Sequence, residues 1–153
     1  MNDLILYWNA TALEANKVSH SNGAGQQTGP TLSARALAIV HLAIYDAFAG
    51  ITKNPAILPP YLPGLPVPPA GAGLEAAVAA AAYDTLFSLF PIQKPFFDTQ
   101  LAAATIPAAG KATGTAFGKQ VALAILADRL TDPSASDAGY VPHCDGIVPS
   151  LFQ

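Results

Sequence analysis

Residues 4–20 read LILYWNATALEANKVSH and residues 29–50 read GPTLSARALAIVHLAIYDAFAG, and these two stretches decide the fold. Apolar side chains recur in both at intervals near three or four residues, which places them along one side of a helix. They are Ile5, Trp8, Ala12 and Leu13 in the first stretch, and Leu37, Val40, Ile44 and Phe48, with His41 on the same side, in the second. The spacing predicts two α-helices, the first ending within residues 20–25 and the second stopping at Gly50.

The starts of these two helices are marked by residues with a known preference for helix ends. Asp3 precedes the first apolar position and can accept hydrogen bonds from the free N–H groups of the first turn. Gly29 and Pro30 interrupt the chain before the second helix, and Thr31 or Ser33 is predicted to cap it.

The remainder of the chain alternates between apolar helical stretches and proline. Residues 54–70 contain seven prolines, too many for a helix or a sheet, and predict an extended strap. Further helices are predicted from Leu74 to the residue before Pro91, over residues 95–104, and over residues 107–130. No stretch shows sustained alternation with a period of two. We therefore expect an all-α fold, a bundle of about five helices with a proline-rich connecting strap.

Three glycines recur at intervals of four residues in the last predicted helix, at Gly110, Gly114 and Gly118. Each glycine inside a helix costs about 1 kcal/mol relative to alanine. A compensating contact is needed, and the spacing predicts that the backbone of another helix approaches this face closely.

The composition limits the possible functions. Apolar residues make up 52% of the chain and charged residues only 11%, against about 25% in ordinary soluble domains. This surplus predicts a covering surface, either a second copy of the chain in a homo-oligomer or a complementary catalytic chain. A net charge of −3 without a basic stripe argues against nucleic acid. Cys144 is the single cysteine, so no disulfide framework is expected.

The sequence shows no clear targeting signal. The most apolar run, residues 76–90, contains Asp84 and is shorter than the ~20 residues that span a bilayer. No transmembrane segment and no secretory signal are predicted, and a cytoplasmic location is permitted.

The order of motifs in residues 4–51 resembles the opening of the vanadium-dependent haloperoxidases, relatives of the phosphatidic acid phosphatases. It comprises an aromatic-amide pair, a Ser-His turn, a Gly-Pro break and a helix with Arg-x5-His-x4-Asp. The likeness returns in residues 117–122 and in residues 132–142, which end in Gly-Tyr-Val-Pro. The resemblance implies an N-terminal helical domain over residues 1–142, followed by an irregular tail, residues 143–153, that does not look like the family. It also implies vanadate as the cofactor of the complete family protein, bound in the second half of a much longer chain.

Arg35, His41 and Asp46 are the residues closest to a family motif, Ser-Arg-x3-Gly-x-His-x3-Asp. The Arg–His offset agrees, but Ile39 replaces the glycine and Asp46 falls one position late. The family's Lys-x6-Arg-Pro and Pro-Ser-Gly-His motifs are missing, and the chain has two arginines in total. We therefore assign no catalytic, cofactor-binding or metal-binding residue in this chain, and no cofactor. Instead, Arg35, His41 and Asp46 are predicted to form a structural polar cluster with Glu14.

The other residues capable of chemistry are given structural roles. His20 is expected at a helix C-terminus, where the helix dipole favours it. Ser33 and His41 lie more than two turns apart on one helix, too far for a Ser-His relay. His143, Cys144 and Asp145 are three potential ligands in a row, for which disorder near the terminus is favoured over a metal site.

Three functions remain open at this point. The first is a non-catalytic helical subunit or fragment, the N-terminal half of a haloperoxidase-like protein, with a packing and interaction role. The second is one part of a haloperoxidase, or of a related acid phosphatase, completed by another chain that carries the oxyanion site. The third is a stand-alone helical bundle that binds a small molecule.

Overall fold

The computed structural model describes residues 3–132, and within this range the chain forms five α-helices and one short 3₁₀-helix, with no strand. The all-α prediction is confirmed. The elements follow in the order α1 (Leu4–Ser19), α2 (Pro30–Thr52), α3 (Leu74–Leu89), η1 (Pro91–Gln93), α4 (Lys94–Ala103) and α5 (Lys111–Asp128).

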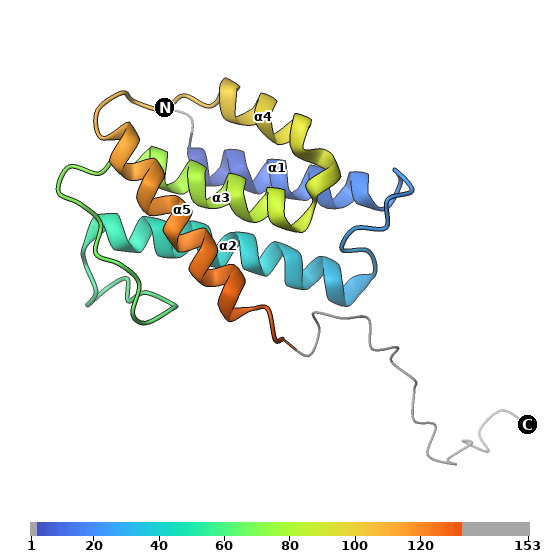
Figure 1. The fold of residues 1–153 in the computed structure, drawn as a ribbon, viewed down its shortest axis with the longest axis horizontal. Helices are drawn as coiled ribbons and strands as arrows, with labels where there is room; N and C mark the ends of the chain where they lie inside the picture. The colour runs from blue at the N-terminus through green and yellow to red at the C-terminus, as the bar shows by residue number, and fades with distance from the viewer. Residues whose placement is uncertain (1–2, 133–153) are drawn as a thin grey trace, which may run out of the picture.

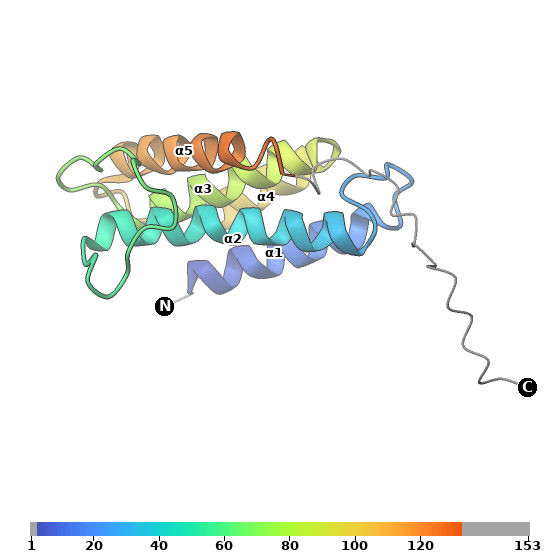
Figure 2. The same cartoon turned by 90° about the horizontal axis from the view of Figure 1, so that it is seen from below.

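The helices are stacked in layers around α2 and α3. These two helices pack against each other in the middle of the molecule, and α1 and α5 lie on opposite sides of the pair (Figure 1, Figure 2). The short helix α4 packs along α3. Trp8, which the spacing placed on the apolar side of the first helix, is fully buried, and the aromatic rings of Phe90, Phe97 and Phe117 fill the core with it. Leu13, placed on the same side by the spacing, is instead 49% exposed.

Several predicted helix ends agree with the structure. Asp3 caps α1, because its carboxylate accepts hydrogen bonds from the N–H groups of Ile5 at 2.9 Å and Leu6 at 3.3 Å. The predicted positions of α3 and α4 agree with the structure to within about one residue.

The predicted ends of α2 are wrong. Its N-cap is Gly29, whose φ of 87° few other residues tolerate, and neither Thr31 nor Ser33 caps it by a side-chain hydrogen bond. The helix also passes through Gly50 and ends at Thr52, and its C-cap, Lys53, adopts the left-handed conformation. Gly50 serves packing instead, because the ring of Phe117 occupies the space that a β-carbon would need there.

The last helix starts four residues later than the prolines suggested, at Lys111, and ends at Asp128 rather than near residue 130. Gly110 is its N-cap, with a φ of 66°. Gly114 and Gly118 lie inside the helix and face the backbone of α3 near Gly73 and Ala77. The predicted close approach of two helix backbones is therefore confirmed, and the second helix belongs to the same chain.

The proline-rich strap, residues 54–70, contains no helix or strand, as predicted. It leaves the end of α2, loops outward and returns to the start of α3 (Figure 1).

Among the described residues, α2 is the helix long and apolar enough to span a membrane by length and composition alone. Within the most apolar window of this helix 44% of the residues are buried, and α1, α3 and α5 all pack against the helix. The apolar run judged by sequence, residues 76–90, lies instead in α3 and the residue after it.

Candidate functional site

The structure does not bring Glu14, Arg35, His41 and Asp46 into one polar cluster. Each has its own partner. Glu14 lies on the outer part of α1, where its carboxylate accepts a hydrogen bond from the ammonium group of Lys17 at 3.0 Å. Exposed ion pairs within a helix contribute little to stability, so this pair marks a solvated surface.

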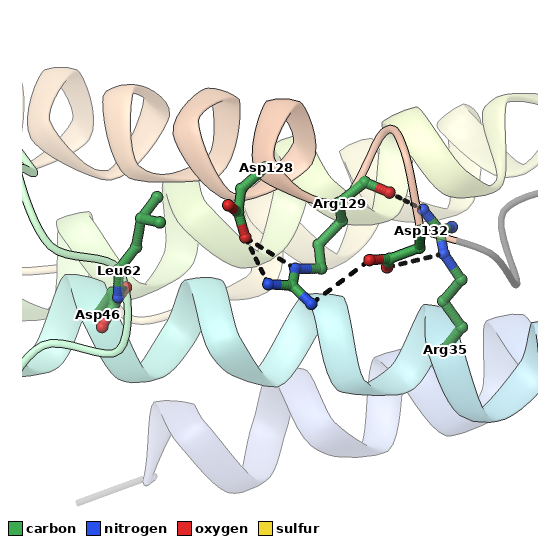
Figure 3. Close-up of polar contacts among 6 residues, drawn as sticks. All are labelled: Arg35, Asp46, Leu62, Asp128, Arg129 and Asp132. Atoms are coloured by element: carbon green, nitrogen blue, oxygen red, sulfur yellow. Dashed lines mark hydrogen bonds and ion pairs between the residues drawn. The ribbon is translucent and has the colours of Figure 1, made fainter.

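Arg35 joins α2 to the segment that follows α5. Its Nε donates to the carboxylate of Asp132 at 3.3 Å, and a second nitrogen donates to the backbone carbonyl oxygen of Arg129 (Figure 3). The side chain of Arg35 is only 12% exposed, so this charge needs partners to remain in place. The contact fastens the end of α5 onto the first half of α2.

Arg129 extends the same network (Figure 3). Its Nε donates to Asp128 at 2.9 Å, and another guanidinium nitrogen donates to Asp132 at 3.4 Å. The hydrogen bond to Asp128 raises the pKa of the guanidinium above its ordinary value. The same guanidinium lies 5.4 Å from the ring centre of Tyr61, which connects the network to the strap.

Asp46 is fully buried and holds the proline-rich strap against α2. One carboxylate oxygen accepts from the backbone N–H of Tyr61 at 2.6 Å, and the other accepts from the N–H of Leu62 at 3.0 Å (Figure 3). The strap lacks secondary structure, so these two N–H groups have no ladder partner. The carboxylate therefore has a structural role that fits its burial.

The two histidines within the described residues also bind to other groups of the fold. His41 Nε2 lies 3.0 Å from the side-chain oxygen of Asn9 and connects α2 with α1. His20 caps the end of α1, as expected, with Nδ1 at 2.7 Å from the carbonyl oxygen of Asn16. Its other nitrogen lies 3.4 Å from the hydroxyl oxygen of Ser33.

The pairing of Ser33 with His20 was missed by sequence analysis, which considered Ser33 only beside His41. No spacing rule connects positions thirteen residues apart across a loop. Ser33 also lies 3.0 Å from the carbonyl oxygen of Gln27, to which its hydroxyl donates. The hydroxyl has one hydrogen, and the shorter contact to Gln27 takes it. Ser33 therefore does not donate to His20, and these two residues do not form an activated nucleophile.

The described residues do not fit vanadate. An oxyanion of this kind requires several cationic donors that converge on one point. Arg35 and Arg129 are the two arginines of the chain, and both are already bonded to Asp128, Asp132 or backbone. No group of three His, Cys, Asp or Glu side chains within residues 3–132 is arranged to hold a metal ion. His143, Cys144 and Asp145 lie outside the described residues.

Comparisons with known proteins agree with the resemblance found in the sequence. The family model for the vanadium chloroperoxidase N-terminal domain matches residues 1–147. A curated relative, the vanadium chloroperoxidase of Curvularia inaequalis, is 43% identical over 100 residues. That match covers 60% of this chain and 16% of the relative. No solved structure matches the chain.

Proposed function

Because the chain belongs to the vanadium chloroperoxidase N-terminal domain family, we propose that it is a non-catalytic helical part of a haloperoxidase-like protein, with a packing and interaction role. The observation that carries this proposal is the use of both arginines inside the fold. Each guanidinium is neutralised by a carboxylate of the α5 end, so neither is free to hold an oxyanion.

The outer face of α5 supports the interaction role. This face is made of exposed, uncharged residues spaced alternately four and three positions apart. They are Ala116, Gln120, Leu123, Ala127 and Leu130. Leu130 lies just beyond the end of the helix. Leu123 is 66% exposed and Leu130 is 75% exposed. Covering a leucine contributes about 1.5–3 kcal/mol, so this face favours association.

The occupant that we propose for the α5 outer face is the catalytic portion of a haloperoxidase-like protein. The match to the curated relative covers 16% of that protein, which leaves most of its length to pack against a domain of this type. Vanadate would belong to that portion and not to the residues described in this chain.

The experiment measures vanadate and halide chemistry on the purified chain. Equilibrium dialysis with orthovanadate and peroxide-dependent bromination or chlorination of an indicator should both give the values of a protein-free blank. Stoichiometric vanadate binding, or halide oxidation by this chain alone, would contradict the non-catalytic role.

A matched pair of variants tests the face. Leu123→Lys places a charge on the α5 outer face, whereas Leu13→Lys places one at an exposed position of α1, the helix on the other side of the α2–α3 pair. If the α5 outer face binds the catalytic portion, sedimentation of the chain mixed with that portion should show less complex for Leu123→Lys than for Leu13→Lys. Loss of the complex in Leu13→Lys alone would move the surface to α1. A complex that persists in both variants would contradict the use of either face.

A second candidate function is one part of an enzyme completed by another chain, and the likeness to a vanadium chloroperoxidase favours it. In this case a separate chain would carry the oxyanion site and bind the α5 outer face. Halide oxidation that appears only when both chains are mixed, and that is lost in Leu123→Lys, would distinguish this function from a purely structural one.

A further inference from the structure

A hollow of about 540 Å³ lies between α3, α4 and the first half of α5, away from the arginine network. Its floor is formed by three alanines of α3, Ala76, Ala79 and Ala80. Leu101 of α4 and Ile106 of the following loop add apolar surface at one side. The volume falls within the range of about 300–1,000 Å³ typical of small-molecule sites.

One wall of the hollow is a row of hydrogen-bond donors on α5. Lys111, Thr115 and Lys119 follow one another at four-residue intervals, which places them along the same side of the helix. None of the ion pairs within residues 3–132 involves Lys111 or Lys119. Within these residues, therefore, neither ammonium group is held by an ion pair.

The acidic side chains of the hollow do not cancel these two charges. Asp98 is already neutralised by the ammonium group of Lys94 at 2.7 Å and accepts a hydrogen bond from the hydroxyl of Tyr83. Asp84 is half-buried, and burial raises the pKa of its carboxyl group, while the charge of Lys119 lowers it. Two ammonium groups against one remaining carboxylate leave an excess of one positive charge.

We propose that this hollow binds a small amphipathic anion, an organic acid with one carboxylate and an aromatic or branched apolar body. The apolar body would lie on the alanine floor, which has no side chain beyond the β-carbon to obstruct a flat ring. The carboxylate would accept hydrogen bonds from Lys111, Thr115 or Lys119. This site is independent of the packing role proposed above, because it lies on other residues than the α5 outer face.

The probe for the test is 2-naphthoate, measured by calorimetry on the full chain, with 2-naphthalenemethanol as its neutral counterpart. We expect naphthoate to bind at least tenfold more tightly than the alcohol. Lys119→Gln should weaken naphthoate binding about tenfold, because it removes a charge-assisted hydrogen bond to the carboxylate. Binding of the alcohol should change little in this variant.

Two further variants separate this site from general effects. Lys53→Gln removes a lysine from the strap side of the molecule, at a different hollow, and should leave naphthoate binding unchanged. Ala80→Leu fills the floor and should abolish binding of both probes. Lys119 is exposed, so its variant keeps the test decisive even if Ala80→Leu fails to fold.

Three results would overturn the proposal. The first is equal affinity for the acid and the alcohol, which would remove the role of charge. The second is an equal loss of naphthoate binding in Lys53→Gln and Lys119→Gln, which would indicate attraction by net charge alone. The third is no naphthoate binding at millimolar concentration to the folded wild-type chain.

Discussion

Replacing Gly118 by alanine should destabilise the protein, although alanine is the better helix former. Gly118 lies in the middle of α5, where that helix packs against α3. A β-carbon at this position would overlap the carbonyl oxygen of Ala77 and would lie 2.9 Å from its carbonyl carbon and 3.0 Å from its Cα. These atoms belong to the backbone of another helix, so one of the two helices must move to relieve the overlap.

Two opposing terms set the magnitude. Alanine gains about 1 kcal/mol of helix propensity relative to glycine. Overpacking a close contact costs typically about 1–3 kcal/mol, and rigid backbone neighbours place this site at the upper end. We expect Gly118→Ala to lower the free energy of unfolding by about 1–2 kcal/mol, which corresponds to a decrease in Tm of about 2–8 °C.

Thermal and urea unfolding followed by circular dichroism at the helix band measure this difference. Gly50→Ala is the matched control, because its β-carbon would meet the ring of Phe117, a side chain and not the backbone of another helix. The loss should therefore be smaller at Gly50 than at Gly118. A Tm for Gly118→Ala above that of the wild type would refute the close packing of α5 on α3.

Three further changes test other parts of the fold. Trp8→Ala should cost about 3–5 kcal/mol in urea unfolding, because the indole is fully buried, and wild-type stability would contradict its place in the core. In Asp46→Asn the side chain can accept only one of the two hydrogen bonds from the strap N–H groups, so the free energy of unfolding should fall by about 1.5–3 kcal/mol. Proteolysis within residues 54–70 should become faster in this variant but not in the control variant Asp128→Asn. Burial raises the pKa of Asp84 in the folded state, so ionisation of this carboxyl group lowers the free energy of unfolding as pH rises above its ordinary pKa of 3.8. Asp84→Asn should therefore be more stable than wild type at pH 7. In urea unfolding this advantage should vanish as pH falls to 3.8. An advantage of Asp84→Asn that does not change with pH would show that burial of its charge is not the cause.

The helices could be predicted because their signals are local. Apolar residues at three- to four-residue intervals and the Asp3 cap act over a few residues, and the structure agrees with the helices and the cap that they predict, although Leu13 of the predicted apolar side is 49% exposed. The errors also have local causes. Gly50 looks like a stop signal, but the chain tolerates it inside α2 because Phe117 fills the space beside it. Pro107 looks like a start signal, but the left-handed Gly110 sets the first turn of α5.

The partners of the buried polar groups could not be predicted in this way. Arg35 binds a carboxylate 97 positions later in the chain, and Asp46 binds backbone N–H groups that carry no residue-specific signal. We predicted one polar cluster of Glu14, Arg35, His41 and Asp46 because a buried charge needs a partner and these four side chains lie on the first two predicted helices. In the fold Arg35, His41 and Asp46 each fasten a different pair of segments, whereas Glu14 pairs with Lys17 inside α1. Only the three-dimensional arrangement reveals these uses.

Four of the seven lysines and arginines of the chain form ion pairs within the described residues. Within residues 3–132, the cations found in ion pairs are Lys17, Arg35, Lys94 and Arg129. Two of them, Arg35 and Arg129, hold the end of α5 against α2, the first by its own contacts and the second through Asp132.

This leaves the outer face of α5 without charge and the α3–α4–α5 hollow with two lysines, Lys111 and Lys119, that form no ion pair within residues 3–132. The same helix thus carries an apolar surface suited to protein packing and a row of donors suited to a small anion. Leu123 follows Lys119 by four residues, so the two surfaces meet there. Leu130→Lys, farther along the chain, should therefore leave naphthoate binding intact, and Lys119→Gln should leave association intact. Loss of both properties in either variant would mean that α5 presents one surface and not two.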